Sequence, residues 1–203
     1  MLMKNERLAA LHTAFDQDTH VLTIEAPALG LAAGGEASGG GQKLRADLRT
    51  QEGRLAVEAF FRRFMPKELR GPPKILHAEG HSFSDVARKV VSIINLASVA
   101  AIEDMVGGPV NPLRFRGNVY VEGWPAWSEL DLVGRELKIG GARLKVVKRI
   151  VRCAATNVDP DTGARDLNIP QTLMRNLAHA DCGIYAEVID GGEIAAGDEI
   201  EIV

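Results

Sequence analysis

The most regular pattern of apolar and polar positions lies between residues 52 and 64. One helical face there carries only apolar residues, namely Leu55, Ala59, Phe60 and Phe64. Arginine side chains occupy the opposite face, and Pro66 follows directly. This spacing predicts an amphipathic helix over Glu52–Phe64 that ends at the proline.

In the rest of the chain, apolar and polar residues mostly alternate with the two-residue period of strands. Strands are expected over the ranges 20–25, 42–49, 74–77, 90–95, 115–121, 136–139, 144–153, 182–189 and 199–203, and residues 8–15 fit a strand or a short helix. The Gly140-Gly141 pair predicts a hairpin. Further helices are expected over about 97–106 and 170–179, and residues 127–132 fit one helical turn. Residues 27–41 are rich in glycine, alanine and serine and predict a loop, with room for a short strand over 29–32.

Many short strands with three short helices favour a mainly β, α+β fold, such as a β-barrel, over a doubly wound α/β sheet. The chain has 203 residues, 46% of them hydrophobic, which suits a globular domain of good size. We therefore expect a single domain over 1–203.

Charge and composition narrow the classes of function. The formal net charge is −3, so an extensive nucleic-acid surface is not expected. No run of about 18 apolar residues is present, so no membrane span is expected. The polar N-terminus shows no export signal, and two cysteines cannot make a disulfide framework. We expect reduced thiols and a cytoplasmic protein.

Cys153 is the first candidate for chemistry. Arg152 directly precedes it and Arg149 lies four residues before, and neighbouring cations favour a reactive thiolate. Strand alternation places Arg152 on the face opposite Cys153. The competing interpretation is a buried cysteine that acts as a small apolar residue, and it holds more strongly for Cys182.

A second candidate is the basic pair Arg114 and Arg116. One residue apart on an extended chain, their guanidinium groups would point to the same side and form a fork for an anion. A solvated strand edge is the alternative.

Other patterns are weaker. His77, His81 and Asp85 could ligate a metal, but the segment predicts a hydrogen-bonded loop. Trp124 and Trp127 could line a pocket or cover a core.

Several strings together resemble one family. Leu113-Arg-Phe-Arg-Gly-Asn-Val-Tyr-Val-Glu-Gly123 is similar to the arginine–asparagine strand of MOSC domains (molybdenum cofactor sulfurase C-terminal). Arg152-Cys-Ala-Ala-Thr-Asn-Val-Asp-Pro-Asp-Thr-Gly163 resembles the cysteine motif of that family. The resemblance covers residues 82–203 as a MOSC core, and residues 1–80 resemble more weakly the N-terminal part of the family in shortened form.

The resemblance implies a MOSC-type β-barrel with about three short helices. It implies that Cys153 is the catalytic residue and ligates molybdenum. It also implies a set of residues that contact the molybdenum cofactor: Arg114, Arg116, Asn118, Arg152 and Thr156. Members that hold the cofactor usually carry a Tyr-Pro-Val-Lys-Ser stretch near the N-terminus, which has no match here.

Three hypotheses follow from the resemblance. In the first, the protein binds the molybdenum cofactor and reduces N-hydroxylated small molecules with electrons from a partner protein. In the second, Cys153 carries sulfur as a persulfide received from a cysteine desulfurase, for metal–sulfur cluster assembly without the cofactor. In the third, the barrel is a non-catalytic binding module.

Overall fold

The computed structural model describes residues 4–27, 41–80, 86 and 88–203, and these divide into two compact units. The first unit comprises residues 1–81 with 161–163, and the second comprises residues 82–160 with 164–203. The short strand considered at 29–32, and the weak metal-ligand candidates His81 and Asp85, lie outside the described residues. Each unit has its own hydrophobic core.

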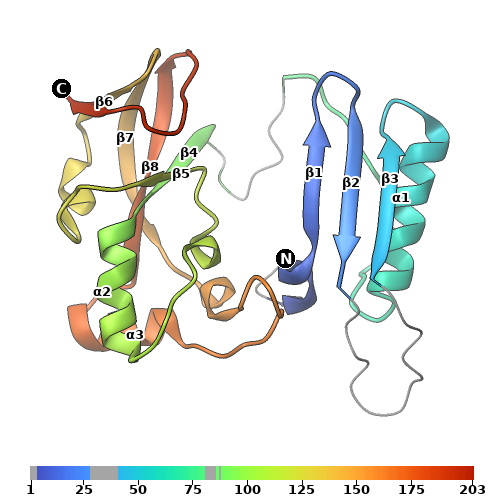
Figure 1. The fold of residues 1–203 in the computed structure, drawn as a ribbon, viewed down its shortest axis with the longest axis horizontal. Coiled ribbons are helices and arrows are strands. Elements are labelled where there is room, and N and C mark those ends of the chain that lie inside the picture. The colour runs from blue at the N-terminus through green and yellow to red at the C-terminus, as the bar shows by residue number, and fades with distance from the viewer. Residues whose placement is uncertain (1–3, 28–40, 81–85, 87) are drawn as a thin grey trace. The chain divides into compact units, whose positions relative to one another are not determined.

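The first unit is a three-stranded antiparallel sheet with one helix (Figure 1). Its elements are η1 (Glu6–Ala10), β1 (His12–Asp16), β2 (Val21–Ala26), β3 (Gln42–Asp47) and α1 (Gln51–Phe64). Residues 8–15 therefore supply both the end of a short 3-10 helix and most of a strand. The range 74–77, which was predicted to be a strand, has no regular structure.

Helix α1 begins at a capping threonine and packs through one face. The Thr50 hydroxyl accepts a hydrogen bond from the Gly53 amide at 3.0 Å, which satisfies one of the free amides of the first turn. Val57, Phe60 and Phe64 are buried against Ile24 of β2. Leu55, which we expected on this face, is 49% exposed because the buried stripe runs through Val57 instead.

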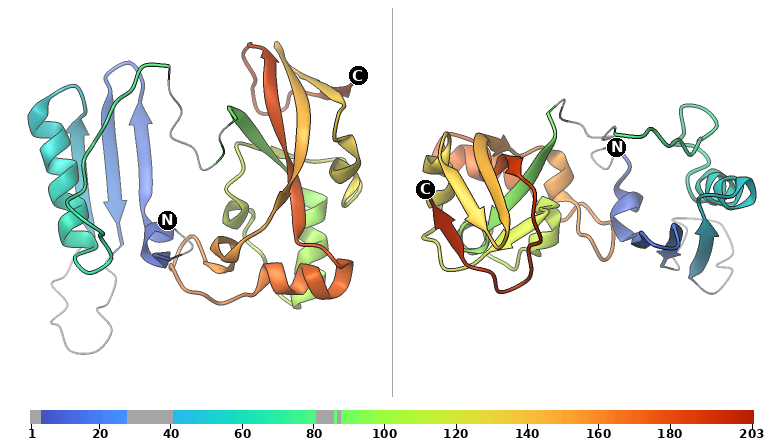
Figure 2. Two further views of the ribbon diagram at one scale, coloured as in Figure 1. Left: turned by 180° about the vertical axis from the view of Figure 1, so that it is seen from behind. Right: turned by 90° about the horizontal axis from the view of Figure 1, so that it is seen from above.

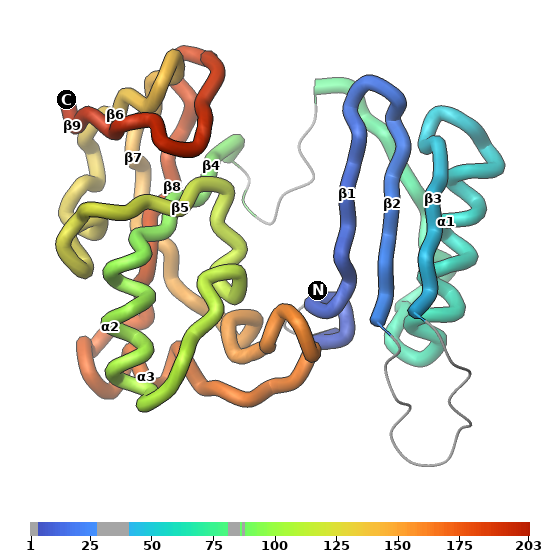
Figure 3. Tube along the Cα trace, in the orientation of Figure 1, coloured from blue at the N-terminus to red at the C-terminus, as the bar shows by residue number. Residues whose placement is uncertain are grey.

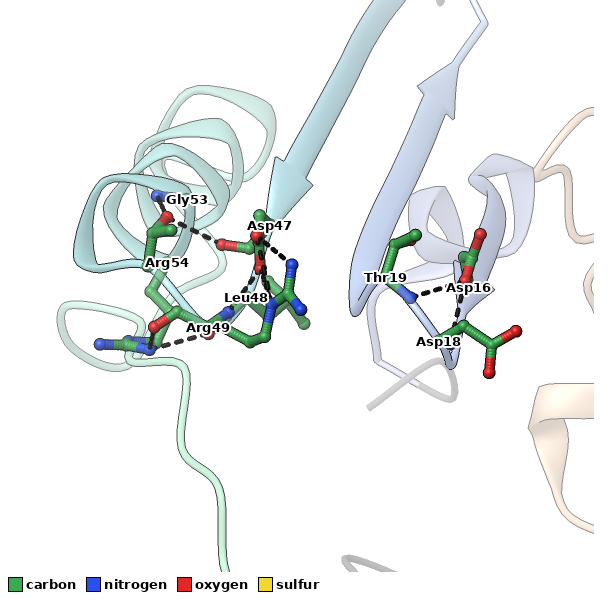
Figure 4. Close-up of polar contacts among 9 residues, drawn as sticks. Asp16, Asp18, Thr19, Asp47, Leu48, Arg49, Gly53 and Arg54 are labelled. Carbon is green, nitrogen blue, oxygen red and sulfur yellow. Dashed lines mark hydrogen bonds and ion pairs between the residues drawn. The ribbon is translucent and has the colours of Figure 1, made fainter.

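Two tight turns in this unit, one after β1 and one after β3, are closed by aspartate side chains, and Figure 4 shows both. Arg49 donates to the Asp47 carboxylate, with its Nη2 at 2.8 Å from Oδ2. This contact lowers the pKa of Asp47 to about 2. After β1, the Asp16 carboxylate accepts the backbone amides of Asp18 and Thr19 and closes the β1–β2 connection.

The second unit is a six-stranded mixed sheet with two helices. Its strands are β4 (Val90–Asn95), β5 (Val119–Val121), β6 (Glu136–Ile139), β7 (Ala142–Val151), β8 (Asp181–Asp190) and β9 (Ile200–Ile202). Its α-helices are α2 (Leu96–Val106) and α3 (Ile169–Leu177), and its 3-10 helices are η2 (Pro112–Phe115), η3 (Ser128–Leu132) and η4 (Ala154–Asn157).

The strand order is β5-β4-β8-β7-β6-β9, in which only β4 and β5 run parallel (Figure 3). The sheet is curled into half a barrel, and two views of it are given in Figure 2. One core packs α2 and α3 on the sheet through Ile102 and Leu173, and a second core fills the other face through Leu137 and Ile184. The described residues form three α-helices and nine strands, so the predicted α+β, mainly β class is confirmed.

Local sequence explains most boundaries in this unit. Helix α2 begins where the Asn95 side chain accepts the Ala97 amide at 3.1 Å and ends at Gly107, whose φ of 75° suits glycine. The Gly140-Gly141 turn joins β6 and β7 as predicted. No helix in the described part of the chain is long and apolar enough to cross a membrane.

Candidate functional site

Cys153 lies where strand β7 gives way to the short helix η4. Its carbonyl oxygen accepts hydrogen bonds from the Thr156 amide at 3.1 Å and from the Thr156 hydroxyl at 3.0 Å. Thr156 is itself only 3% exposed. The backbone of Cys153 is thus fixed by a buried residue, while its thiol is exposed. Cys182, by contrast, is fully buried, which agrees with the interpretation of this residue as a small apolar side chain.

Arg152 points inward from the same strand end. Its Nε donates to the carbonyl oxygen of Cys182 at 2.6 Å, and Nη2 donates to the same oxygen. Its Nη1 donates to the carbonyl oxygen of Phe115 at 3.1 Å, and the guanidinium lies over the Phe115 ring. Burial lowers the pKa of Arg152. The opposite orientation of Arg152 and Cys153 is the one that strand alternation predicts.

The contact between Arg152 and Phe115 connects the cysteine segment to the arginine–asparagine segment. Arg116 directly follows Phe115, so one guanidinium ties the backbone beside Cys153 to the backbone beside Arg116. Arg116 has a left-handed conformation with φ of 52° and ψ of 45°. Its side chain is exposed and makes no ion pair with any residue that the structure describes.

Asn118 is held by Ser92 of β4. The Asn118 Oδ1 accepts the Ser92 amide at 2.9 Å and the Ser92 hydroxyl at 2.9 Å, and the Asn118 amide donates to the Ser92 carbonyl at 2.9 Å. Because the Ser92 amide can only donate, the side-chain oxygen of Asn118 must face it. Within the described residues, the Nδ2 group therefore remains a donor for another molecule.

The position of the Arg114 side chain differs from the sequence-based prediction. Residues 112–115 form a 3-10 helix that begins at Pro112 and is capped by the Asn111 side chain, so the extended chain assumed over 115–121 is reduced to β5. Arg114 is therefore buried at 4% exposure while Arg116 is exposed. The expectation that both guanidinium groups point to one side was wrong.

The buried guanidinium of Arg114 binds two carboxylates beyond η4. Its Nη1 and Nη2 donate to the Asp166 carboxylate at 2.8 and 2.7 Å, and Nη2 also donates to Asp159 at 3.0 Å. These bonds lower the pKa of Asp166. Its Nε is buried without a hydrogen-bond partner in the described structure. Arg114 thus clamps both ends of the loop that follows the cysteine.

The six predicted site residues therefore fall into two groups. Arg114, Arg152 and Thr156 are buried and hold the segments in place. Cys153, Arg116 and Asn118 are exposed on the two segments that these bonds join. Sequence reasoning missed Ser92, Asp159 and Asp166, of which only Asp159 carried a signal, as the start of the dense turn sequence Asp159–Gly163.

The weaker candidates are not part of this arrangement. His77 is exposed in a segment without regular structure, and the described residues contain no cluster of three side chains suited to a metal ion. Trp124 and Trp127 pack against the two cores of the sheet and so cover apolar side chains. A hollow of about 460 Å³ at β6 and β9 is lined by Lys138, Gly140 and residues 199–201, none of them a predicted site residue.

Comparisons with known proteins identify the family of the chain. Residues 78–201 match the family model of the MOSC domain. The chain is 30% identical over 122 residues to mitochondrial amidoxime reducing component 2 from Bos taurus, a match that covers 54% of this chain and 36% of the relative. It is 28% identical over 123 residues to mitochondrial amidoxime-reducing component 1 from Homo sapiens, covering 55% and 36%.

The chain thus spans little more than a third of the length of these curated relatives. Among solved structures, YiiM from Geobacillus stearothermophilus is similar with a TM-score of 0.45 and 18% identity, covering 56% of this chain and 53% of that one. The family model covers well over half of the 203 residues, including Arg116, Asn118 and Cys153. The chain belongs to the MOSC domain family.

Proposed function

We propose that this protein holds the molybdenum cofactor and reduces N-hydroxylated small molecules such as amidoximes. The observation that carries the proposal is the joining of two segments by the buried Arg152, which leaves Cys153, Arg116 and Asn118 exposed beside the join. The similarity to amidoxime reducing components, as they are named, supports the choice of substrate.

The exposed groups suit the cofactor chemically. A thiolate is a soft ligand of the kind that binds molybdenum, and Cys153 is the exposed thiol. Arg116 and the Nδ2 group of Asn118 would bind an anionic pterin or substrate through charge-assisted hydrogen bonds. When bound, the cofactor supplies a centre that accepts and delivers two electrons.

The overall reaction balances as a two-electron reduction. An amidoxime takes up two electrons and two protons, its N–O bond breaks, and an amidine and water leave. The electrons would come from an electron-transfer partner protein. The residues of this chain bind and orient: Arg116 and Asn118 hold the bound anion, and Thr156 fixes the backbone from which the Cys153 thiol projects.

We further propose that Arg114 and Arg152 serve this site as its frame, since their guanidinium groups are already bonded to protein oxygens. In this proposal residues 82–203 are the MOSC core, and residues 1–80 correspond to the N-terminal part of the family. Two cysteines kept as thiols suit the reducing cytoplasm, where we place the protein.

Metal and pterin content test the proposal. The protein is produced in cells that make the cofactor, and molybdenum is measured by mass spectrometry and the pterin by fluorescence after oxidation. We expect both in the wild type, loss of molybdenum in C153S, and reduced pterin in R116Q. R149Q is a matched control, because Arg149 pairs with Asp131 at the surface, and should retain both. A wild type without metal and pterin would overturn the proposal.

The second candidate function is sulfur transfer, which the contrast between the exposed Cys153 and the buried Cys182 favours. A persulfide on a cysteine desulfurase would pass its outer sulfur to Cys153, which becomes a persulfide while the donor is released as a thiol. Intact mass after incubation with the desulfurase and cysteine should show one added sulfur in the wild type and none in C153S. A protein that gains neither sulfur nor cofactor would act as a non-catalytic binding module.

A further inference from the structure

Glu129 is a buried acid that the proposed function does not use. It lies on η3 and its side chain is completely buried. Its carboxylate accepts hydrogen bonds from the Ser98 hydroxyl at 2.9 Å, the Asn95 Nδ2 at 2.9 Å and the Gly183 amide at 3.3 Å. Within the described structure, no cationic side chain forms an ion pair with it. A buried carboxylate without a cation is costly and calls for a compensating charge.

Arg152 presents the opposite case. Its guanidinium is buried, and in the described structure it binds only carbonyl oxygens and no carboxylate. A buried cation in this setting also needs compensation, which carbonyl dipoles give only in part.

Glu129 and Arg152 bind opposite ends of one peptide group. Arg152 donates to the carbonyl oxygen of Cys182, and the next amide, that of Gly183, donates to Glu129. These two groups belong to the same peptide bond, so its positive N–H end faces the carboxylate, its negative C=O end faces the guanidinium, and both ends are stabilised. Both charges also act on the Cys182 thiol, whose pKa burial raises to about 12, with Arg152 lowering it and Glu129 raising it.

The backbone at this point permits little movement. Gly183 has φ of 81°, and a Cβ there would lie 2.6 Å from the Ile93 carbonyl oxygen and 2.9 Å from Arg152 Nη2. Only glycine fits both the conformation and the space. The peptide is therefore a fixed link between Glu129 and Arg152.

We propose that Glu129 is a positioning residue of the Cys153 site, acting through the Cys182–Gly183 peptide on Arg152. Arg152 in turn ties the segment that carries Cys153 to the segment that carries Arg116. Loss of the Glu129 charge would free the guanidinium from its fixed orientation. The inference rests on the proposed function only in taking Cys153 and Arg116 as the working groups.

The direct readout is hydrogen exchange of the Arg152 Nε–H by NMR. In E129Q we expect this proton to exchange about tenfold faster than in the wild type, equivalent to about 1.4 kcal/mol. The amide signals of Cys153 and Arg116 should shift as well. S98A is the matched control, because it removes one donor to Glu129 but leaves the charge and the Gly183 contact. It should change the exchange rate by about twofold at most.

A double-mutant cycle separates coupling from ordinary packing. E129Q and R152Q should each lower the Tm, and the double variant should lose less than the sum of the two losses. E129Q with R114Q should be additive, since Arg114 pairs with other acids. If E129Q alone does not fold, recovery of folding in E129Q/R152Q supports the proposal, and failure of the double variant while R152Q folds contradicts it.

Unchanged Arg152 exchange in E129Q, or additive losses in the E129Q/R152Q cycle, would overturn the inference. None of these measurements needs the cofactor. Absence of molybdenum would therefore refute the proposed function without affecting the link between Glu129 and Arg152, and additivity would refute the link without affecting the proposed function.

Discussion

The clamp that Arg114 forms on the loop after Cys153 gives a sharp test by substitution to methionine. Methionine keeps much of the length of the side chain but removes three charge-assisted hydrogen bonds to Asp159 and Asp166. Removing one partner of a buried ion pair costs about 3–5 kcal/mol. Asp166 is 46% exposed and can regain water, which lowers the expected loss for R114M to about 2–3 kcal/mol.

Urea unfolding followed by tryptophan fluorescence measures this loss. Trp124 and Trp127 are the two tryptophans of the chain and both lie in the second unit, so the signal reports on the unit that contains the clamp. With a slope of about 1–3 kcal/mol per molar urea, the midpoint of R114M should fall by about 0.7–3 M.

Two further variants define what would refute this reasoning. D166N leaves Asp159 as a partner for Arg114 and should cost about 1 kcal/mol. R149M removes an exposed ion pair with Asp131 and a hydrogen bond to the Leu130 carbonyl, and should cost about 1 kcal/mol. A midpoint for R114M as high as that of R149M, or a larger loss in D166N than in R114M, would show that the clamp does not stabilise the loop as its geometry indicates.

Three other outcomes are expected. Iodoacetamide should add one label to the native chain, at the exposed Cys153, and a second label at Cys182 only after unfolding. Two labels on the native protein, measured by intact mass, would contradict the burial of Cys182. G183A should lower the unfolding free energy by about 2 kcal/mol or more, measured by urea unfolding, because a side chain there is both strained and crowded. The pKa of Asp47 is lowered from 3.8 to about 2 by Arg49, so its contribution to stability is present above pH 4 and is lost as the pH falls through 2. Acid unfolding of α1 followed by circular dichroism should show this dependence in the wild type and not in D47N.

Elements with a clear period could be predicted from the sequence. Helix α1, the strand β4 with the helix that follows it, and the β6–β7 hairpin all agree with the structure, since their apolar spacing, caps and glycine turn act locally. The error at Leu55 arose because two neighbouring helical faces both carry apolar residues. The sheet of the first unit buries the face with Val57.

The candidate site was predictable only in part. Strand alternation correctly separates Cys153 from Arg152, but it wrongly treats Arg114 and Arg116 as a pair on an extended chain. Pro112 and the Asn111 cap favour a 3-10 turn over residues 112–115. The burial of Arg114 in that turn depends on its ion pair with Asp166, which lies 52 positions away in the sequence. Glu129 carried no sequence signal, because its role depends on a peptide group that β8 brings to it.

The central place of β8 in the sheet has a consequence for synthesis on the ribosome. β8 pairs with β4 on one side and with β7 on the other, so it joins the β4–β5 pair to the β6–β7 hairpin. It is the eighth of nine strands in the described chain, and contacts of such sequence separation form slowly. Until β8 emerges, a nascent chain holds two separate ribbons whose apolar faces are open to chaperones or to aggregation. The Cys182–Gly183 peptide arrives with this same strand, so Arg152 lacks its carbonyl partner until β8 has been synthesised.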